Sequence, residues 1–289
     1  MMPMRVHLAR FTNDRGQPIM TYRWVPRGRP RALVLMLHSI AEHSMLYDRV
    51  GQTLATKGFY VFAHDHAGHG ISGGERGHIN DITDLVSDAR LHVAFIRQAF
   101  PNYPMFILGH SVGGLIAMLV SYVMEIQGLI LISPYLVSTE ESVPRDFLPI
   151  LRELDLRNPR RHIERADFPL MAADESVVRV LRMDHLCYSG DWTARTICSL
   201  LDLSESALDY LWRITAPFII MHGIKDKVCD MEGPVRVTEE SSSSDSQMKD
   251  GRVVMASAFA LQLKTTGTQE RSVRSELTEE ICERKLHIE

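Results

Sequence analysis

Short apolar runs alternate along the chain with longer segments in which apolar residues recur every three or four positions. The short runs are typical of buried strands, and the periodic segments are typical of amphipathic helices. We expect an edge strand at residues 19–25, buried strands at 32–37, 59–63, 104–108, 128–133 and 217–221, and helices at 47–57, 82–100 and 112–120. This alternation predicts an α/β fold with a mostly parallel central sheet that is covered by helices on both faces.

The alternation breaks in two places. Residues 138–213 contain charged and amphipathic segments and no expected strand, so we interpret them as a helical cap inserted over the strand ends, where α/β sheets bind ligands. The serine-rich polar run that begins at residue 239 is typical of a solvated linker. The pattern therefore predicts a core at residues 1–137 and 214–238, a cap at 138–213 and a divergent, poorly ordered tail at 239–289.

A serine lies between two glycines where the run at 104–108 meets the helical segment that follows it. The residues Gly109-His110-Ser111-Val112-Gly113 fit the pattern Gly-x-Ser-x-Gly, a nucleophile elbow in which small residues let a strand and a helix approach closely. The backbone N–H of Val112 would open the helix and point at a bound carbonyl oxygen. A glycine-rich turn that carries a serine by chance is the alternative, but the expected strand before it and helix after it favour the elbow.

Composition narrows the class of protein without identifying a site. The chain has 289 residues, of which 45% are hydrophobic and 24% charged, as in ordinary soluble globular proteins, and a net charge of -4 gives no reason to expect nucleic acid as a partner. The N-terminus lacks the apolar segment of a signal peptide, and no stretch approaches the roughly 20 apolar residues of a membrane span. Cys187, Cys198, Cys229 and Cys282 lack metal-type spacing, so we expect reduced thiols in a cytoplasmic protein.

Several motifs besides the elbow occur in a fixed order between about residues 5 and 237. They are His38-Ser-Ile-Ala-Glu-His-Ser44, Ala63-His-Asp-His-Ala-Gly-His-Gly70, Gly74-Glu-Arg-Gly-His78 and Leu131-Ile-Ser-Pro134. Together with the elbow, this set resembles the monoacylglycerol lipase family of α/β-hydrolases. The resemblance implies a serine esterase that hydrolyses a monoacylglycerol to a fatty acid and glycerol, without a cofactor. It also implies Ser111 as the nucleophile, Asp226 as the acid that orients the catalytic histidine, and the backbone N–H groups of Ile40 and Val112 as the oxyanion hole.

The catalytic histidine is where the chain departs from the family. The order serine, acid, histidine requires a histidine after Asp226, and His287 is the only one there. The family carries this residue on a loop after one more strand, so we infer that the last strand and its histidine loop are replaced by unrelated sequence. Whether the chain is an active enzyme therefore stays open. The alternatives are a catalytically impaired or non-catalytic protein that binds an acyl ligand, and a short-chain esterase or lysophospholipase.

Three smaller features complete the sequence-based expectations. Ser39 stands where the family has glycine in its oxyanion loop, so strain is expected there if the turn requires a positive φ. His64, His66 and His69 are spaced irregularly and have no residue that would complete a tetrahedral set, so we expect no metal site among them. Residues 147–154 are unusually apolar for the charged cap. We expect them either to touch a lipid bilayer peripherally or to pack on the core.

Overall fold

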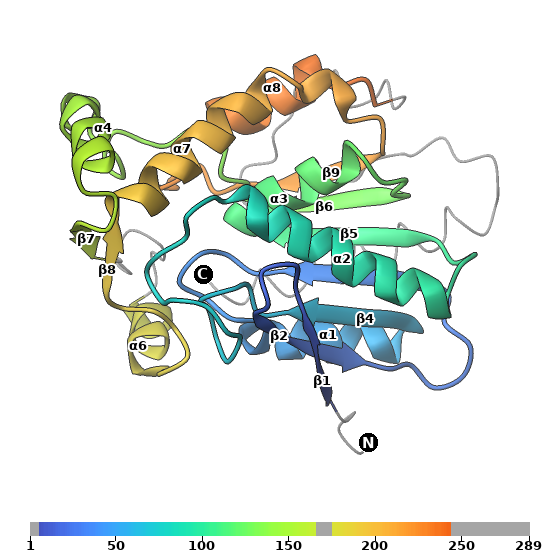
Figure 1. Cartoon of the computed structure of the whole chain (residues 1–289). Coiled ribbons are helices and arrows are strands. Elements are labelled where there is room, and N and C mark those ends of the chain that lie inside the picture. Colours follow the sequence, from blue (N-terminus) through green and yellow to red (C-terminus); the bar gives the residue numbers. More distant parts are fainter. Residues whose placement is uncertain (1–5, 166–174, 244–289) are drawn as a thin grey trace.

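A computed structural model of the chain describes residues 6–165 and 175–243 (Figure 1). Its central sheet has seven strands in the order β1-β2-β4-β3-β5-β6-β9. The strands are β1 (Val6–Thr12), β2 (Pro18–Trp24), β3 (Ala32–Leu37), β4 (Phe59–His64), β5 (Met105–His110), β6 (Gly128–Ile132) and β9 (Phe218–Met221). All neighbouring pairs from β4 to β9 are parallel, whereas β1–β2 and β2–β4 are antiparallel, which confirms the predicted mostly parallel sheet.

Two apolar cores form because successive side chains of a strand point to opposite faces of the sheet. Leu33, Leu35 and Leu37 of β3 belong to the larger core, whereas Val34 and Met36 belong to the smaller one. Helices α2 (Thr83–Ala99), α3 (Val112–Ser121), α7 (Ala194–Leu208) and α8 (Glu232–Glu240) contribute to the larger core, and α1 (Asp48–Thr56) contributes to the smaller one. Helices therefore cover both faces, as predicted (Figure 1).

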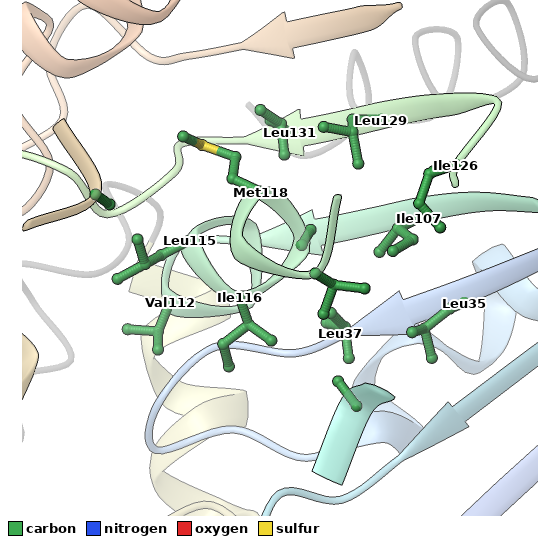
Figure 2. Close-up of a cluster of buried hydrophobic side chains, with 14 of the residues drawn as sticks. Leu35, Leu37, Ile107, Val112, Leu115, Ile116, Met118, Ile126, Leu129 and Leu131 are labelled. Carbon is green, nitrogen blue, oxygen red and sulfur yellow. The ribbon is translucent and has the colours of Figure 1, made fainter. Parts of the chain in front are cut away.

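Helix α3 lies at the centre of the larger core. Eight of its ten residues are buried, which explains why its sequence is apolar on nearly every side. Figure 2 shows Val112, Leu115, Ile116 and Met118 of this helix among side chains of β3, β5 and β6. This packing fixes the position of the helix N-terminus, and with it the serine that directly precedes it.

Most of the described part of residues 138–213 lies beyond the ends of the parallel strands, and α7 leads from there back over one face of the sheet (Figure 1). The region contains the 3₁₀ helices η2 (Arg145–Phe147) and η3 (Leu211–Arg213), the helices α4 (Leu148–Arg157), α6 (Glu175–Met183) and α7, and two short strands, β7 (His162–Arg165) and β8 (Asp191–Thr193). Hydrogen bonds join it to the core: Tyr188 N donates to Ala41 O at 2.8 Å, and Ile79 N donates to Thr196 Oγ1 at 2.7 Å.

The structure corrects three of the sequence-based expectations. β2 is not the edge strand, because β1 pairs with its outer side, and β1 was missed because most of its side chains are exposed and carry little apolar pattern. The cap contains the antiparallel pair β7–β8, whose strands are too short to produce a periodic signal. Helix α8 (Glu232–Glu240) occupies residues for which the pattern predicts no helix, and its last two residues fall in the expected tail.

The expectations about the C-terminal tail cannot be compared with the structure. Residues 244–289, which include most of the divergent tail and His287, lie outside the described residues. Within the described part, β9 is the last strand on its side of the sheet. None of the helices in that part combines the length and apolar character needed to cross a membrane.

Candidate active site

The elbow is a tight turn between β5 and α3. Ser111, its central residue, has φ 50° and ψ -113°, a conformation that is strained for any residue other than glycine. A Cβ atom on Gly109 would lie 2.2 Å from Gly113 O, and one on Gly113 would lie 2.2 Å from Leu37 O. Both glycines are therefore needed because strand and helix backbones approach too closely for any side chain.

Backbone hydrogen bonds hold Ser111 in this conformation. Its N–H donates to Ile132 O at 2.8 Å, and its carbonyl accepts from Tyr135 N at 3.0 Å. The residue is only 9% exposed, so the elbow is nearly buried and does not lie on an open surface. Within the described residues its Oγ has one hydrogen-bond contact, with Cys229 Sγ at 3.8 Å.

The loop after β3 carries the expected oxyanion donor, Ile40. Ala41, not Ser39, adopts the positive φ in this loop, with φ 68°. The expectation of strain at Ser39 is therefore wrong, because the left-handed conformation falls two residues later. Ser39 instead has its N–H bonded to Glu42 Oε2 at 2.9 Å, so the loop folds back on its own buried carboxylate.

Glu42 also connects the oxyanion loop to the elbow. Its Oε2 accepts from Tyr47 OH at 2.6 Å and lies 3.3 Å from His110 Nδ1, and His110 directly precedes Ser111. Because the phenol donates its proton to Glu42, the 2.7 Å contact between Tyr47 OH and His110 Nδ1 makes the imidazole the donor. Burial opposes ionisation of Glu42, but His110 and the hydrogen bonds from His110, Tyr47 and the Ser39 N–H lower its pKa to about 2. Glu42 is therefore an anion at neutral pH.

Asp226 follows β9, the strand next to β6, so it reaches the same edge of the sheet as the elbow. Its Oδ1 accepts from the N–H groups of Val228 and Cys229, both at 2.9 Å, and its side chain is 18% exposed. Oδ2 lies 3.9 Å from His222 Nε2, too far for a hydrogen bond. One carboxylate oxygen is thus committed to the backbone and the other can accept from a further donor.

Cys229 connects the two candidate residues. Its N–H binds Asp226, and its buried sulfur lies beside the Ser111 hydroxyl. Burial, and then the charge of Asp226, raise the pKa of its thiol, so it is a neutral neighbour and cannot take a proton from the serine. Cys229 is therefore both buried and in contact with Ser111.

The buried histidines closest to the site bind other groups. His222, the nearest in sequence to Asp226, is 4% exposed and bonds through Nε2 to Cys229 O at 2.9 Å. His38 accepts from His66 N through Nε2, so its Nδ1 donates to Ser39 O. Burial lowers the pKa of His38 and of His66 far below the usual value, which keeps both neutral. Within residues 6–165 and 175–243, no imidazole hydrogen-bonds to Ser111 Oγ.

The histidines of the 64–69 segment also form a buried group. His64 contacts His92 through the Nδ1 atoms at 3.1 Å, and His69 Nδ1 lies 3.1 Å from Ala67 O. Burial lowers the pKa of His69 to about 4 and that of His92 to about 3. These rings therefore act as neutral hydrogen-bonding and packing groups beneath the loop after β3.

The site thus combines a serine at a strained turn, the free N–H groups expected at the first turn of a helix, and a carboxylate at the end of the neighbouring strand. Such an arrangement fits attack of a hydroxyl on an acyl carbonyl. Sequence reasoning missed Glu42 and Tyr47. The only signal for them was that an acidic residue and a tyrosine follow a predicted buried strand closely, which is too common to identify a network.

Comparisons with known proteins agree with this site and fold. Residues 28–251 match the model of the family described as serine aminopeptidase, S33. The chain is 33% identical over 245 residues to the monoglyceride lipase of Rattus norvegicus, covering 84% of this chain and 80% of that one. It is 30% identical over 241 residues to the monoacylglycerol lipase of Mycolicibacterium smegmatis, and the match covers 83% of this chain and 86% of that one.

Solved structures are similar in fold at lower identity. A soluble variant of the monoglyceride lipase of Saccharomyces cerevisiae has a TM-score of 0.75 at 22% identity and covers 84% of both chains. The monoacylglycerol lipase of Paleococcus ferrophilus has a TM-score of 0.68 at 23% identity, covering 96% of this chain and all of that one. These similarities confirm the predicted α/β-hydrolase fold.

Proposed function

Because the chain belongs to the serine aminopeptidase S33 family of α/β-hydrolases and, within it, to the monoglyceride lipases, we propose that it hydrolyses the ester bond of a monoacylglycerol to a fatty acid and glycerol. The observation that carries this proposal is the elbow: Ser111 sits at positive φ between two glycines that no larger residue could replace. The curated relatives named as lipases of this substrate match more than four fifths of the chain, which supports the substrate class.

In the proposed mechanism Ser111 Oγ attacks the ester carbonyl. Its proton passes to an imidazole and from there to the departing glycerol oxygen, and water then releases the fatty acid from the serine. The backbone N–H groups of Ile40 and Val112 stabilise the negatively charged tetrahedral oxygen. Asp226 holds the imidazole through Oδ2, which is supported by the commitment of its other oxygen to Val228 and Cys229.

The identity of that imidazole decides how fast the chain turns over. His287 is the only histidine that follows Asp226 in the sequence, and it lies outside the described residues. It is therefore the only candidate for the general base that the order serine, acid, histidine allows. A serine without a base keeps the residual catalysis of the oxyanion hole and substrate binding, but removing one triad member typically costs about 10⁴ to 10⁶ in kcat.

A hydrolysis assay on a monoacylglycerol tests this proposal. We expect turnover by the unchanged chain and a loss of about 10⁴-fold or more in Ser111→Ala; a comparable loss in His287→Ala would identify His287 as the base. His7→Ala is the matched control, because His7 is exposed on β1, far from the elbow in sequence and in the sheet. Background rates in the unchanged chain would refute the enzymatic proposal and leave an acyl-ligand binder. Full activity in His287→Ala, with none in Ser111→Ala, would refute only the role of His287.

We also propose that the cap contacts the bilayer from which the substrate is drawn. Within residues 147–154, Leu151 is fully buried with Val143, Ala194 and Cys198, so it cannot take part. On the same helix Ile150 is 55% exposed and Leu156 is 79% exposed, so two large apolar side chains of α4 face solvent. Exposed apolar side chains flanked by charged residues are typical of helices that lie at a membrane surface.

Vesicle co-sedimentation tests the membrane contact. The double variant Ile150→Asp/Leu156→Asp should bind phospholipid vesicles several-fold more weakly than the unchanged chain. Leu8→Asp serves as the control, because Leu8 is 54% exposed on β1. Equal binding by all three proteins would rule out this use of α4.

A further inference from the structure

His43, Asp184 and Cys187 converge where the cap meets the loop after β3. Each offers one atom that can bind a metal ion, and these atoms lie within 4.8 Å of one another. His43 Nε2 lies 2.9 Å from Asp184 Oδ2. We propose that the three side chains form a zinc site that ties the cap to the core.

Local backbone structure places these side chains together. His43 directly precedes the 3₁₀ helix η1 (Ser44–Tyr47), while Asp184 and Cys187 follow the end of α6. The N–H of Asp184 donates to Val180 O at 3.0 Å and that of Cys187 donates to Asp184 O at 3.1 Å, so both residues belong to one compact turn. Asp184 Oδ1 accepts from Leu186 N at 2.9 Å, which orients Oδ2 toward His43. This is the kind of supporting hydrogen bond that fixes a metal-binding carboxylate.

The donor set selects the metal. One imidazole nitrogen, one thiolate sulfur and one carboxylate oxygen suit zinc, and such three-residue sites complete a tetrahedron with water. Zinc bond lengths place the donor atoms of a tetrahedron about 3.4 to 3.6 Å apart. His43 and Asp184 must therefore separate by roughly 0.5 Å, and the sulfur must move by little more than 1 Å. Side-chain rotation can supply shifts of this size without a change in the backbone.

The charges of the ligands also favour the site. His43 is 3% exposed and Cys187 is 5% exposed, so an isolated cation would be costly there. One carboxylate and one thiolate neutralise the two positive charges of zinc. The Asp184 side chain is 25% exposed and leaves a route to solvent for the ion and for the water that completes its shell. On the far side of the turn Arg76 donates to Leu186 O at 2.8 Å and stabilises the turn.

Zinc binding requires two changes of protonation, one at Cys187 and one at His43. The S–H bond of Cys187 breaks, the sulfur–zinc bond forms and the proton leaves to the buffer. His43 now donates through Nε2 to Asp184, and it binds zinc through Nε2 after its proton moves to Nδ1. Nδ1 is buried without a partner among the described residues, so this change of tautomer does not add an unpaired group.

A zinc ion at this site would stabilise the contact between the cap and the loop after β3, which carries the proposed oxyanion donor. Ala41, two residues before His43, accepts the hydrogen bond from Tyr188 of the cap, and it packs in one apolar cluster with Cys187 and Trp192. A metal ion that bridges His43 to the turn after α6 would hold the cap in its present position over this loop. Zinc availability would then control how readily the cap moves.

Metal binding to the purified full chain tests the proposal. We expect one equivalent of zinc in equilibrium dialysis and a rise in Tm of roughly 5 to 10 °C at a hundredfold excess over Kd. Cobalt substituted for zinc should give the near-ultraviolet charge-transfer absorption of a cobalt–thiolate bond. Cys187→Ser keeps the His43–Asp184 contact but should lose this absorption and the rise in Tm. Cys198→Ser, which alters a buried cysteine between α4 and α7, should keep both.

A measurement on the unchanged chain covers the case in which Cys187→Ser does not fold. Zinc should slow alkylation of Cys187 by iodoacetamide, followed by mass spectrometry, at least about tenfold and leave Cys198 unaffected. No zinc retained at micromolar concentrations, or a cobalt–thiolate absorption that persists in Cys187→Ser, would overturn the proposal. Equal alkylation of Cys187 with and without zinc would overturn it as well.

Discussion

The buried carboxylate of Glu42 provides the sharpest quantitative test of the site. Its pKa falls from the ordinary 4.5 to about 2 because the effects of His110, Tyr47 and the Ser39 N–H outweigh burial. A shift of one unit corresponds to about 1.4 kcal/mol, so ionised Glu42 contributes at most about 3 kcal/mol to the free energy of unfolding. Glu42→Gln keeps the size of the side chain and an acceptor for Ser39 N, but removes the charge. We expect the variant to be less stable than the unchanged chain by about 1 to 3 kcal/mol at pH 7.

The direction of the pH dependence follows from the sign of the shift. The folded pKa lies below the unfolded value, so the stabilisation is fully present above about pH 4.5 and is lost as the pH falls toward 2. The difference in the free energy of unfolding between the unchanged chain and Glu42→Gln should therefore become smaller between pH 4.5 and pH 3. Urea unfolding at pH 7, 4.5 and 3 measures this difference.

A surface glutamate gives the matched control. Glu153 pairs with Arg157 on the exposed face of α4, where an ion pair of this type contributes at most about 0.5 kcal/mol. Glu153→Gln should therefore unfold within about 0.5 kcal/mol of the unchanged chain at every pH. If Glu42→Gln lowers the free energy of unfolding by less than about 0.5 kcal/mol at pH 7, or by the same amount at pH 7 and pH 3, then the charge of Glu42 does not stabilise the fold.

Two further substitutions separate packing from chemistry at the elbow. Gly113→Ala places a Cβ atom 2.2 Å from Leu37 O, a backbone atom that cannot move aside. We therefore expect urea unfolding to show a loss of roughly 3 kcal/mol or more in the free energy of unfolding. A loss below about 1 kcal/mol would contradict the close approach of the two backbones. Asp226→Asn retains an oxygen for the N–H groups of Val228 and Cys229, so its Tm should change little while monoacylglycerol hydrolysis drops by about 10⁴; unchanged hydrolysis would exclude Asp226 from the triad.

Apolar periodicity predicted the sheet because its signal comes from burial on both faces. Leu33 to Leu37 read as an unbroken apolar run for the physical reason that alternate residues face two different cores. The same signal fails where burial is one-sided or absent. β1 carries exposed residues at most positions, and β7 and β8 are only four and three residues long, so none of them could be predicted from pattern.

Local geometry at the site was predictable only where the backbone itself imposes it. Gly109 and Gly113 are required by contacts between main-chain atoms, and such constraints are visible in a short motif. The resemblance made Ser39 the residue at which a positive φ would cause strain, but the structure has the positive φ at Ala41, and the Ser39 N–H binds Glu42. A hydrogen bond from a buried side chain back to its own loop leaves no periodic or compositional trace.

The pairing of Glu42 with His110 shows why catalytic support is harder to predict than the catalytic residues themselves. A nucleophile must sit at a turn of restricted geometry, so its neighbours in the sequence are constrained and form a motif. A residue that holds this turn from another loop needs only a charge, a short reach and a buried position, which many residues could supply. Its partners lie 3, 5 and 68 residues away in the chain, at Ser39, Tyr47 and His110. The packing of α3 against β3 and β5 brings the elbow to that carboxylate. The network therefore depends on tertiary structure and could not be predicted from the sequence alone.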